Sequence, residues 1–183
     1  MKHLLLAFTL ILSFAACKNN NGSKNNMLEV DLKEIEFKTI NNVSTAHYEG
    51  KPFNGKVVTK LKSGKPFTSY EYKDGIKHGA YATWYGNGNM QKEGFYNMGK
   101  EHGEFKEYYE NGDLQRHHHW DNDKKVKTWL SYYEGGAKWT HREFENDQLN
   151  GKVYVWDEEG ELGKEYDYVR GNLTNKIMHF ENK

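Results

Sequence analysis

Three consecutive histidines, His117 to His119 in the stretch RHHHW, are the residues whose types and spacing best suit chemistry in this chain. Imidazole is a frequent zinc ligand and a frequent acid or base in catalysis, so the run raises the question of a metal-dependent enzyme. On a β-strand, His117 and His119 would point to the same face with their Cβ atoms about 6.5–7 Å apart. Glu104, expected opposite His119, and His141, expected two strands away, are the further candidate ligands.

We nevertheless interpret the histidine run as a polar strand on a solvated face, and we expect no metal, no cofactor and no catalytic residues. A catalytic zinc ion usually has three organised protein ligands, and only two of the three histidines can point the same way. The sequence also contains no GxSxG, HExxH or glycine-rich phosphate-loop motif. A metal-dependent enzyme built on the histidine strand remains an alternative.

The first residues, MKHLLLAFTLILSFAAC, have the features of a secretory signal peptide covering residues 1–16. The apolar run from Leu4 to Ala16 is shorter than the roughly 20 residues that a membrane-spanning helix needs. The run ends directly before Cys17, the only cysteine, and so resembles the lipobox of bacterial lipoproteins, with Phe14 where leucine is usual. The resemblance implies a palmitate-bearing lipid on Cys17 and anchoring in the bacterial envelope, at the outer membrane or cell surface. The polar segment that follows contains no apolar residue, so residues 17–26 are predicted to form a flexible tether. An ordinary signal peptide with a free thiol is the alternative.

Charge and composition narrow the function classes. The chain has 26 basic and 26 acidic residues, and removal of residues 1–16 takes away only Lys2, which leaves 26 − 1 = 25 against 26. A nucleic-acid-binding protein would carry a basic excess, so we expect no nucleic acid partner. The 13 Tyr, 9 Phe, 5 Trp and 18 Gly indicate short strands joined by tight turns.

A period of 24 residues organises residues 54–173 into five blocks. Each block carries three marker columns, with Lys127 the one exception to the first glycine column: Gly55, Gly79, Gly103 and Gly151; Gly64, Gly88, Gly112, Gly136 and Gly160; and the aromatics Tyr72, Tyr96, Trp120, Phe144 and Tyr168. Each block also has two turn signals about eleven residues apart, so each predicts one β-hairpin. We therefore predict an all-β fold, a meandering antiparallel sheet of about ten strands. Residues 27–53 are predicted to form lead-in strands or a cap, and residues 174–183 a C-terminal cap or tail.

Turn chemistry predicts the register inside each hairpin. Pairs such as Asn111-Gly112 are typical of two-residue type I′ turns, in which both residues have positive φ. Such a turn places Phe105 opposite His118, Gly103 opposite Trp120, and Tyr109 opposite Leu114. Aromatic rings would then cover the bare backbone of the glycine column.

Pleat alternation predicts two different faces. An aromatic face would carry Val57, Tyr81, Phe105, Trp129, Val153, Leu61, Tyr85, Tyr109, Tyr133, Met90, Leu114, Leu162 and the aromatic column. A mixed face would carry charged residues around exposed rings, which are typical of recognition surfaces. The candidate binding residues on the mixed face are Trp84, Tyr108, Tyr132, Trp139 and Trp156. The alternative is that these rings pack under the N-terminal segment, the tail or a second subunit.

Blocks such as HGEFKEYYENGDL and HGAYATWYGNGNMQKEGFYNMGK resemble MORN-type repeats, in the bacterial variant assigned to antitoxins of toxin–antitoxin systems. The resemblance covers residues 48–173 and implies a meandering sheet, no cofactor, no catalytic residues, and binding to a protein or a membrane surface. The expected function is therefore that of a non-catalytic, envelope-tethered recognition scaffold with a protein partner. An antitoxin or immunity protein that neutralises a toxin is the alternative.

Overall fold

The computed structural model describes residues 27–179, and these residues form an all-β fold, as predicted. Apart from a single 3-10 turn, η1 (Leu32–Glu34), every regular element in this range is a strand. The lead-in strands are β1 (Glu29–Asp31), β2 (Glu36–Ile40), β3 (Val43–Tyr48) and β4 (Lys51–Pro52). The repeats form β5 (Gly55–Lys60), β6 (Pro66–Lys73), β7 (Ile76–Trp84), β8 (Met90–Asn97), β9 (Lys100–Tyr108), β10 (Leu114–Asp121), β11 (Lys124–Lys125), β12 (Lys127–Tyr132), β13 (Lys138–Glu145), β14 (Gln148–Trp156) and β15 (Leu162–Val169), and β16 (Asn172–Met178) follows.

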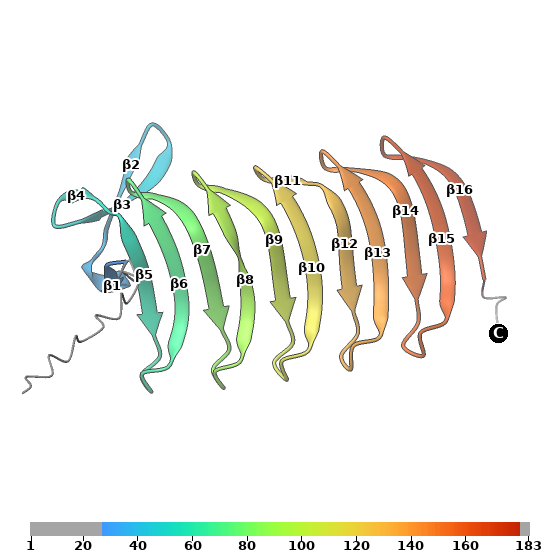
Figure 1. Cartoon of the computed structure of the whole chain (residues 1–183), viewed down its shortest axis with the longest axis horizontal. Coiled ribbons are helices and arrows are strands. Elements are labelled where there is room, and N and C mark those ends of the chain that lie inside the picture. Colours follow the sequence, from blue (N-terminus) through green and yellow to red (C-terminus); the bar gives the residue numbers. More distant parts are fainter. Residues whose placement is uncertain (1–26, 180–183) are drawn as a thin grey trace, which may run out of the picture.

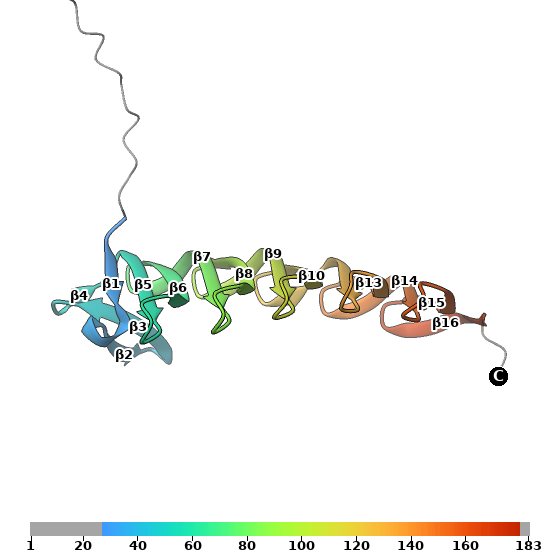
Figure 2. The same ribbon diagram turned by 90° about the horizontal axis from the view of Figure 1, so that it is seen from below.

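The repeat strands pair in chain order and form one antiparallel meander (Figure 1). Five hairpins, β5–β6, β7–β8, β9–β10, β12–β13 and β14–β15, supply the predicted ten strands of the 13-stranded sheet. Neighbouring hairpins lie side by side along the long axis, and each strand bends in the same direction (Figures 1 and 2). At the far edge, β16 pairs with β15 only, and all of its residues are exposed.

The residues before the repeats close the first edge of the sheet. β1 pairs in parallel with β5, with Val30 opposite Val57, and a separate sheet of order β2-β3-β4 packs beside it. Val30, Ala46, Phe53, Val57 and Tyr72 form the main buried cluster. This cluster buries apolar surface that a single-layer sheet would otherwise leave open at its first strand.

The structure corrects the turn type that was predicted for the Asn-Gly pairs. Gly112 N–H donates to the carbonyl of Tyr109, and only Gly112, not Asn111, has positive φ. This is a three-residue loop made of a type I turn and a left-handed glycine, not the predicted type I′ turn. The two-residue type I′ turns are instead the second turns of each block, where both residues have positive φ: Asp74-Gly75, Met98-Gly99, Asn122-Asp123, Asn146-Asp147 and Arg170-Gly171.

The three-residue loop is followed by a one-residue bulge on the returning strand, and this bulge changes part of the predicted register. Before the bulge Leu114 pairs with Tyr108, not with Tyr109. Beyond the bulge the pairing is as predicted, with His118 opposite Phe105 and Trp120 opposite Gly103. The other hairpins repeat this arrangement, so Met90 and Leu162 pair with Trp84 and Trp156, outside the aromatic face to which alternation assigned them.

The glycines of the first column are required by their positive φ angles and not, as predicted, by aromatic rings that cover them. Gly79, Gly103 and Gly151 have φ of 110°, 82° and 120°, a region that costs little only for glycine. A methyl group at Gly103 would meet nothing within 4 Å, so the ring of Trp120 does not occupy that space. Lys127, the exception in this column, also has positive φ, 57°, and Val126 before it interrupts the strand between β11 and β12.

The aromatic face holds the sheet together through a continuous series of ring contacts. Ring centroids are 5.5 Å apart for Tyr81 and Phe105, 6.5 Å for Phe105 and Trp120, and 4.8 Å for Trp120 and Trp129. His118 is buried on this face and stacks on Trp129 at 4.1 Å. Burial lowers the pKa of His118 to about 4, because the charged imidazolium would lose its hydration there.

Hydrogen bonds with the repeat period join successive hairpins. The hydroxyls of Tyr85, Tyr109 and Tyr133 each donate to a backbone carbonyl 23 residues further along, in the next repeat. At the other end, His78 Nδ1 accepts from the N–H of Met98, as the Asn54 side chain does from Asp74. Residues at the starts of blocks are therefore turn-flanking groups that need no catalytic explanation.

The predicted signal peptide, the tether and the lipidation residue Cys17 lie outside the described residues. Within residues 27–179 there is no helix of the length and apolar character required to cross a bilayer.

Candidate functional site

The mixed face of the sheet carries the groups that are free to meet a ligand. Cross-strand pairing places Glu93, Lys106, His117, Leu130 and His141 in one row across β8 to β13. A second row, nearer the type I′ turns, contains Glu104, His119, Thr128 and Glu143. Most of these side chains are only partly buried, because no second layer covers the face within residues 27–179.

A depression of about 570 Å³ opens in the mixed face over β5 to β9. Three small residues, Ser69, Ala80 and Ala82, are among those that line it, and Ser69 and Ala82 are cross-strand partners. Three aromatic residues line it, Trp84 and Phe95 of the mixed face and Tyr81 of the aromatic face. Its charged residues are Lys56, Glu71, Glu93, Glu104 and Lys106. The depression thus combines apolar rings with charges of both signs, as recognition sites often do.

The depression exists because the second repeat carries small residues where the fifth repeat carries large ones. Positions Ala80 and Ala82 correspond to Lys152 and Tyr154, each 72 residues later in the sequence. In the fifth repeat Lys152 fills the surface with ion pairs, at 2.6 Å to Asp167 and 3.3 Å to Glu165. The sheet therefore accepts large side chains at these positions, so the small ones are not required by the fold.

Four of the five predicted binding residues occupy one repeated position. Trp84, Tyr108, Tyr132 and Trp156 are the last residues of β7, β9, β12 and β14. Equivalent positions are two strands apart, about 9–10 Å, so these rings form a row without stacking on one another. All four are partly exposed. Burial, and then a 2.6 Å hydrogen bond to Glu93, raise the pKa of Tyr108 to about 12.

Trp139 does not join this row. It is the bulged residue between Lys138, which pairs with Tyr132, and Thr140, which pairs with Ser131. Its ring lies 5.7 Å from that of Tyr133, a residue assigned to the aromatic face, and it is 41% exposed. The alternation used for the prediction does not hold through a bulge, because the extra residue breaks the two-residue period.

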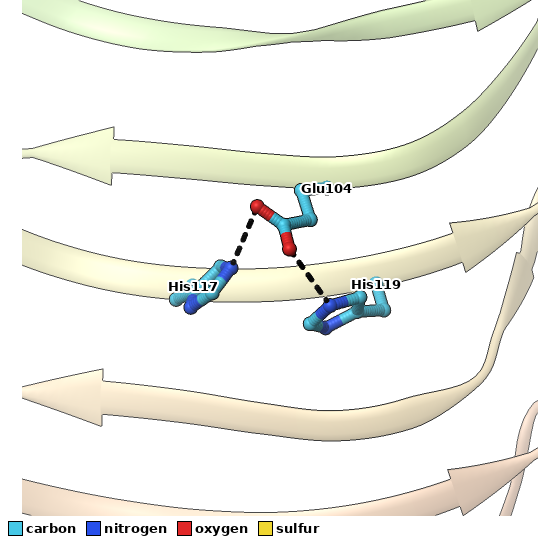
Figure 3. A group of neighbouring side chains, drawn as sticks. All are labelled: Glu104, His117 and His119. Carbon is cyan, nitrogen blue, oxygen red and sulfur yellow. Dashed lines mark ion pairs between the residues drawn. The ribbon is translucent and has the colours of Figure 1, made fainter.

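The structure brings together Glu104, His117 and His119, the three candidate metal ligands (Figure 3). Nε2 of His117 lies 3.6 Å from one carboxylate oxygen of Glu104, and Nε2 of His119 lies 3.5 Å from the other. The pKa of the Glu104 carboxyl lies below its usual range, mainly because of the nearby His117 and to a smaller extent because of His119. His141 is not in this group: its Nε2 is 3.1 Å from Glu143 of its own strand.

No protein-family model matches the chain, and no curated protein is significantly similar to it. The relation to MORN-type repeats and to antitoxins therefore stays a prediction.

Sequence reasoning named the rings and the histidines but missed the depression. The signal was present in the repeat itself, because every residue at the equivalent positions of the other blocks is larger than Ser69, Ala80 and Ala82. Comparison of the five blocks position by position, and not only of their conserved markers, would have located it.

Proposed function

We propose that the protein is a non-catalytic recognition scaffold that binds a protein partner on the mixed face of its sheet. The observation that carries the proposal is the depression over Ser69, Ala80 and Ala82, walled by Trp84 and Phe95. An apolar or aromatic side chain of the partner would enter it, and the surrounding charges would set specificity. Aromatic residues surrounded by polar groups supply much buried area at small entropic cost.

The different environments of the aromatic residues on the two faces support this proposal. The aromatic face is engaged in its own ring contacts, so its large side chains already stabilise the fold. The mixed face keeps Trp84, Phe95 and the other end-of-strand rings partly exposed, at positions where charged residues would suffice for solubility. A row of exposed rings beside a depression therefore has no evident structural purpose.

A filling substitution tests the proposal with little risk to the fold. Ala82→Tyr introduces the residue that the fifth repeat carries at this position, Tyr154, and would occupy the depression. We expect capture of the partner from intact envelopes to fall at least about tenfold, while the thermal midpoint stays within a degree or two. Leu130→Tyr, which introduces the same residue at the equivalent position of the fourth repeat, is the control and should leave capture unchanged.

Equal capture by the wild type and the Ala82→Tyr variant would place binding elsewhere. Equal loss in the Ala82→Tyr and Leu130→Tyr variants would show that the effect is not specific to the depression. Trp84→Ala provides a second reading of the same site, since this ring walls the depression.

We further propose that Cys17 carries a lipid that anchors the protein in the bacterial envelope. The support is the apolar run that ends in Ala15-Ala16-Cys17 and the polar segment after it. Cys17→Ser should abolish palmitate labelling and release the protein from the membrane fraction. An unlabelled Cys17→Ser protein that still sediments with membranes would contradict the anchor.

A further inference from the structure

Two imidazole nitrogens and one carboxylate converge on the mixed face from two adjacent strands (Figure 3). Glu104 lies on β9, His119 lies directly opposite it on β10, and His117 lies two residues further along β10 on the same face. Their ligand atoms all lie within 4.8 Å of one another. The hairpin register brings the three side chains to one face of adjacent strands, and their torsions then set the distances between the ligand atoms.

The distances suit a tetrahedral metal ion. Zinc binds imidazole nitrogen and carboxylate oxygen at about 2.0–2.2 Å, which puts neighbouring ligand atoms about 3.4 Å apart in a tetrahedron. The observed distances from Glu104 oxygens to the Nε2 atoms are 3.6 Å for His117 and 3.5 Å for His119. The two distances involve different oxygens of Glu104, so the carboxylate would bind the ion with both oxygens or turn slightly to present one of them to it.

The hydrogen bonding of the two histidines leaves their Nε2 atoms available. Nδ1 of His119 lies 3.2 Å from the carbonyl oxygen of Thr128, an acceptor, so Nδ1 carries the proton and Nε2 presents its lone pair. Such a backbone partner on the remote nitrogen is the usual second-shell support of a metal-bound histidine. Nε2 of His117 is buried and has no hydrogen-bond partner among residues 27–179.

The neighbouring lysine, Lys106, forms an ion pair with Glu93 and not with Glu104. Lys106 is the cross-strand partner of His117, but its ammonium lies 4.0 Å from the carboxylate of Glu93. A divalent cation between Glu104 and the two histidines would be attracted by the carboxylate charge and would accept the lone pairs of the neutral imidazoles.

The other repeats show that the fold does not need these three residues. In the fourth repeat the equivalents of Glu104, His117 and His119 are Thr128, His141 and Glu143. In the fifth they are Lys152, Glu165 and Asp167, so neither repeat keeps the set of three. Both repeats form the same hairpin with the same bulge. The ligand set is therefore particular to the third repeat, which argues for a local role.

We propose that Glu104, His117 and His119 bind one divalent first-row transition-metal ion of the zinc type, with the remaining coordination position open to solvent. Glu104 is 60% exposed, so the ion is accessible from the mixed face. Glu104 also lines the depression described above, so the ion would lie at its border. The site is independent of the recognition role, because it needs only residues of this chain.

Isothermal titration of the full chain, produced without a polyhistidine tag, with zinc chloride tests the site. We expect one zinc ion per chain at low micromolar or lower concentration, and we expect cobalt(II) to give the intense visible absorption of tetrahedral coordination. His119→Gln and Glu104→Gln should each weaken zinc binding at least about tenfold, since loss of even second-shell partners costs that much. His141→Gln removes a histidine of the same face outside the group and should bind zinc like the wild type.

Absence of stoichiometric zinc binding by the wild type would overturn the proposal. So would undiminished binding by a folded His117→Gln, His119→Gln double variant, or an equal loss in the His141→Gln control. The cobalt spectrum of the wild type decides independently of the variants, because an octahedral spectrum would mean adsorption to surface carboxylates.

Discussion

Replacement of Lys127 by glycine should make the protein more stable, although it removes an exposed lysine from a strand. Lys127 has φ of 57°, whereas glycine fills the equivalent positions Gly79, Gly103 and Gly151 of the other repeats. A non-glycine residue in the left-handed region costs about 1–2 kcal/mol. Glycine removes this strain but adds about 0.5–1 kcal/mol of unfolded-state entropy. The net gain is therefore about 0.5–1 kcal/mol, or roughly 2 °C in thermal midpoint for a chain of this size.

Urea denaturation followed by tryptophan fluorescence measures this gain, with Lys124→Gly as the control. Lys124 is also exposed and close by, but it does not have positive φ, so glycine there should cost about 0.5–1 kcal/mol. Opposite signs for the two variants are the expected result. If Lys127→Gly lowers the midpoint as much as Lys124→Gly does, the backbone of the fourth repeat is not strained and the explanation given for the glycine column is wrong.

Three further expectations concern the glycine column and the aromatic face. Gly103→Ala should lower the free energy of unfolding by about 1–2 kcal/mol in urea denaturation, because of φ strain alone. Gly79→Ala should lower it more, because its methyl group would also meet the carboxylate of Glu71. Equal losses for the two variants would contradict this contact. Trp120→Ala should cost about 3 kcal/mol, since its ring joins two others, and an unchanged midpoint would refute the ring series. For His118 the unfolded pKa of 6.5 exceeds the folded pKa of about 4, so the unfolded chain takes up the proton first and stability falls as pH decreases through this window. This difference in pKa contributes about 2 kcal/mol to the loss of stability, after allowance for screening. The His118→Phe variant should therefore lose about that much less stability than the wild type between pH 7 and 4.5 in urea denaturation. Equal losses in the two proteins would show that His118 is solvated.

Most of the fold could be predicted from the 24-residue repeat period. Glycine and aromatic residues recurring every 24 residues predicted ten strands and paired Gly103 with Trp120, because a hairpin between fixed turns has little freedom of register. The turn type was assigned wrongly because an Asn-Gly pair suits both a type I′ turn and the last two residues of a three-residue loop. The two loops differ by one residue, and a bulge later on the strand absorbs that difference.

The same bulge limited the prediction of the site. Alternation placed Trp84, Tyr108, Tyr132 and Trp156, which precede the loop, but failed for Trp139, which lies at the bulge. The grouping of Glu104 with His119 followed from register, whereas the inward aim of both Nε2 atoms depends on side-chain torsions and on the Thr128 carbonyl. Such details are decided by packing, so the sequence pattern alone could not show them.

Site-specific photo-crosslinking in intact envelopes tests the central claim, that the mixed face is the binding surface. Tyr108 and Tyr109 are neighbours in the sequence but lie on opposite faces, since the Tyr109 hydroxyl bonds to the next repeat and that of Tyr108 bonds to Glu93 of the mixed face. A benzophenone amino acid at position 108 should crosslink to a partner protein of defined mass, and the same probe at position 109 should not. Crosslinking from position 109 alone, or equally from both positions, would contradict the assignment of the mixed face as the recognition surface.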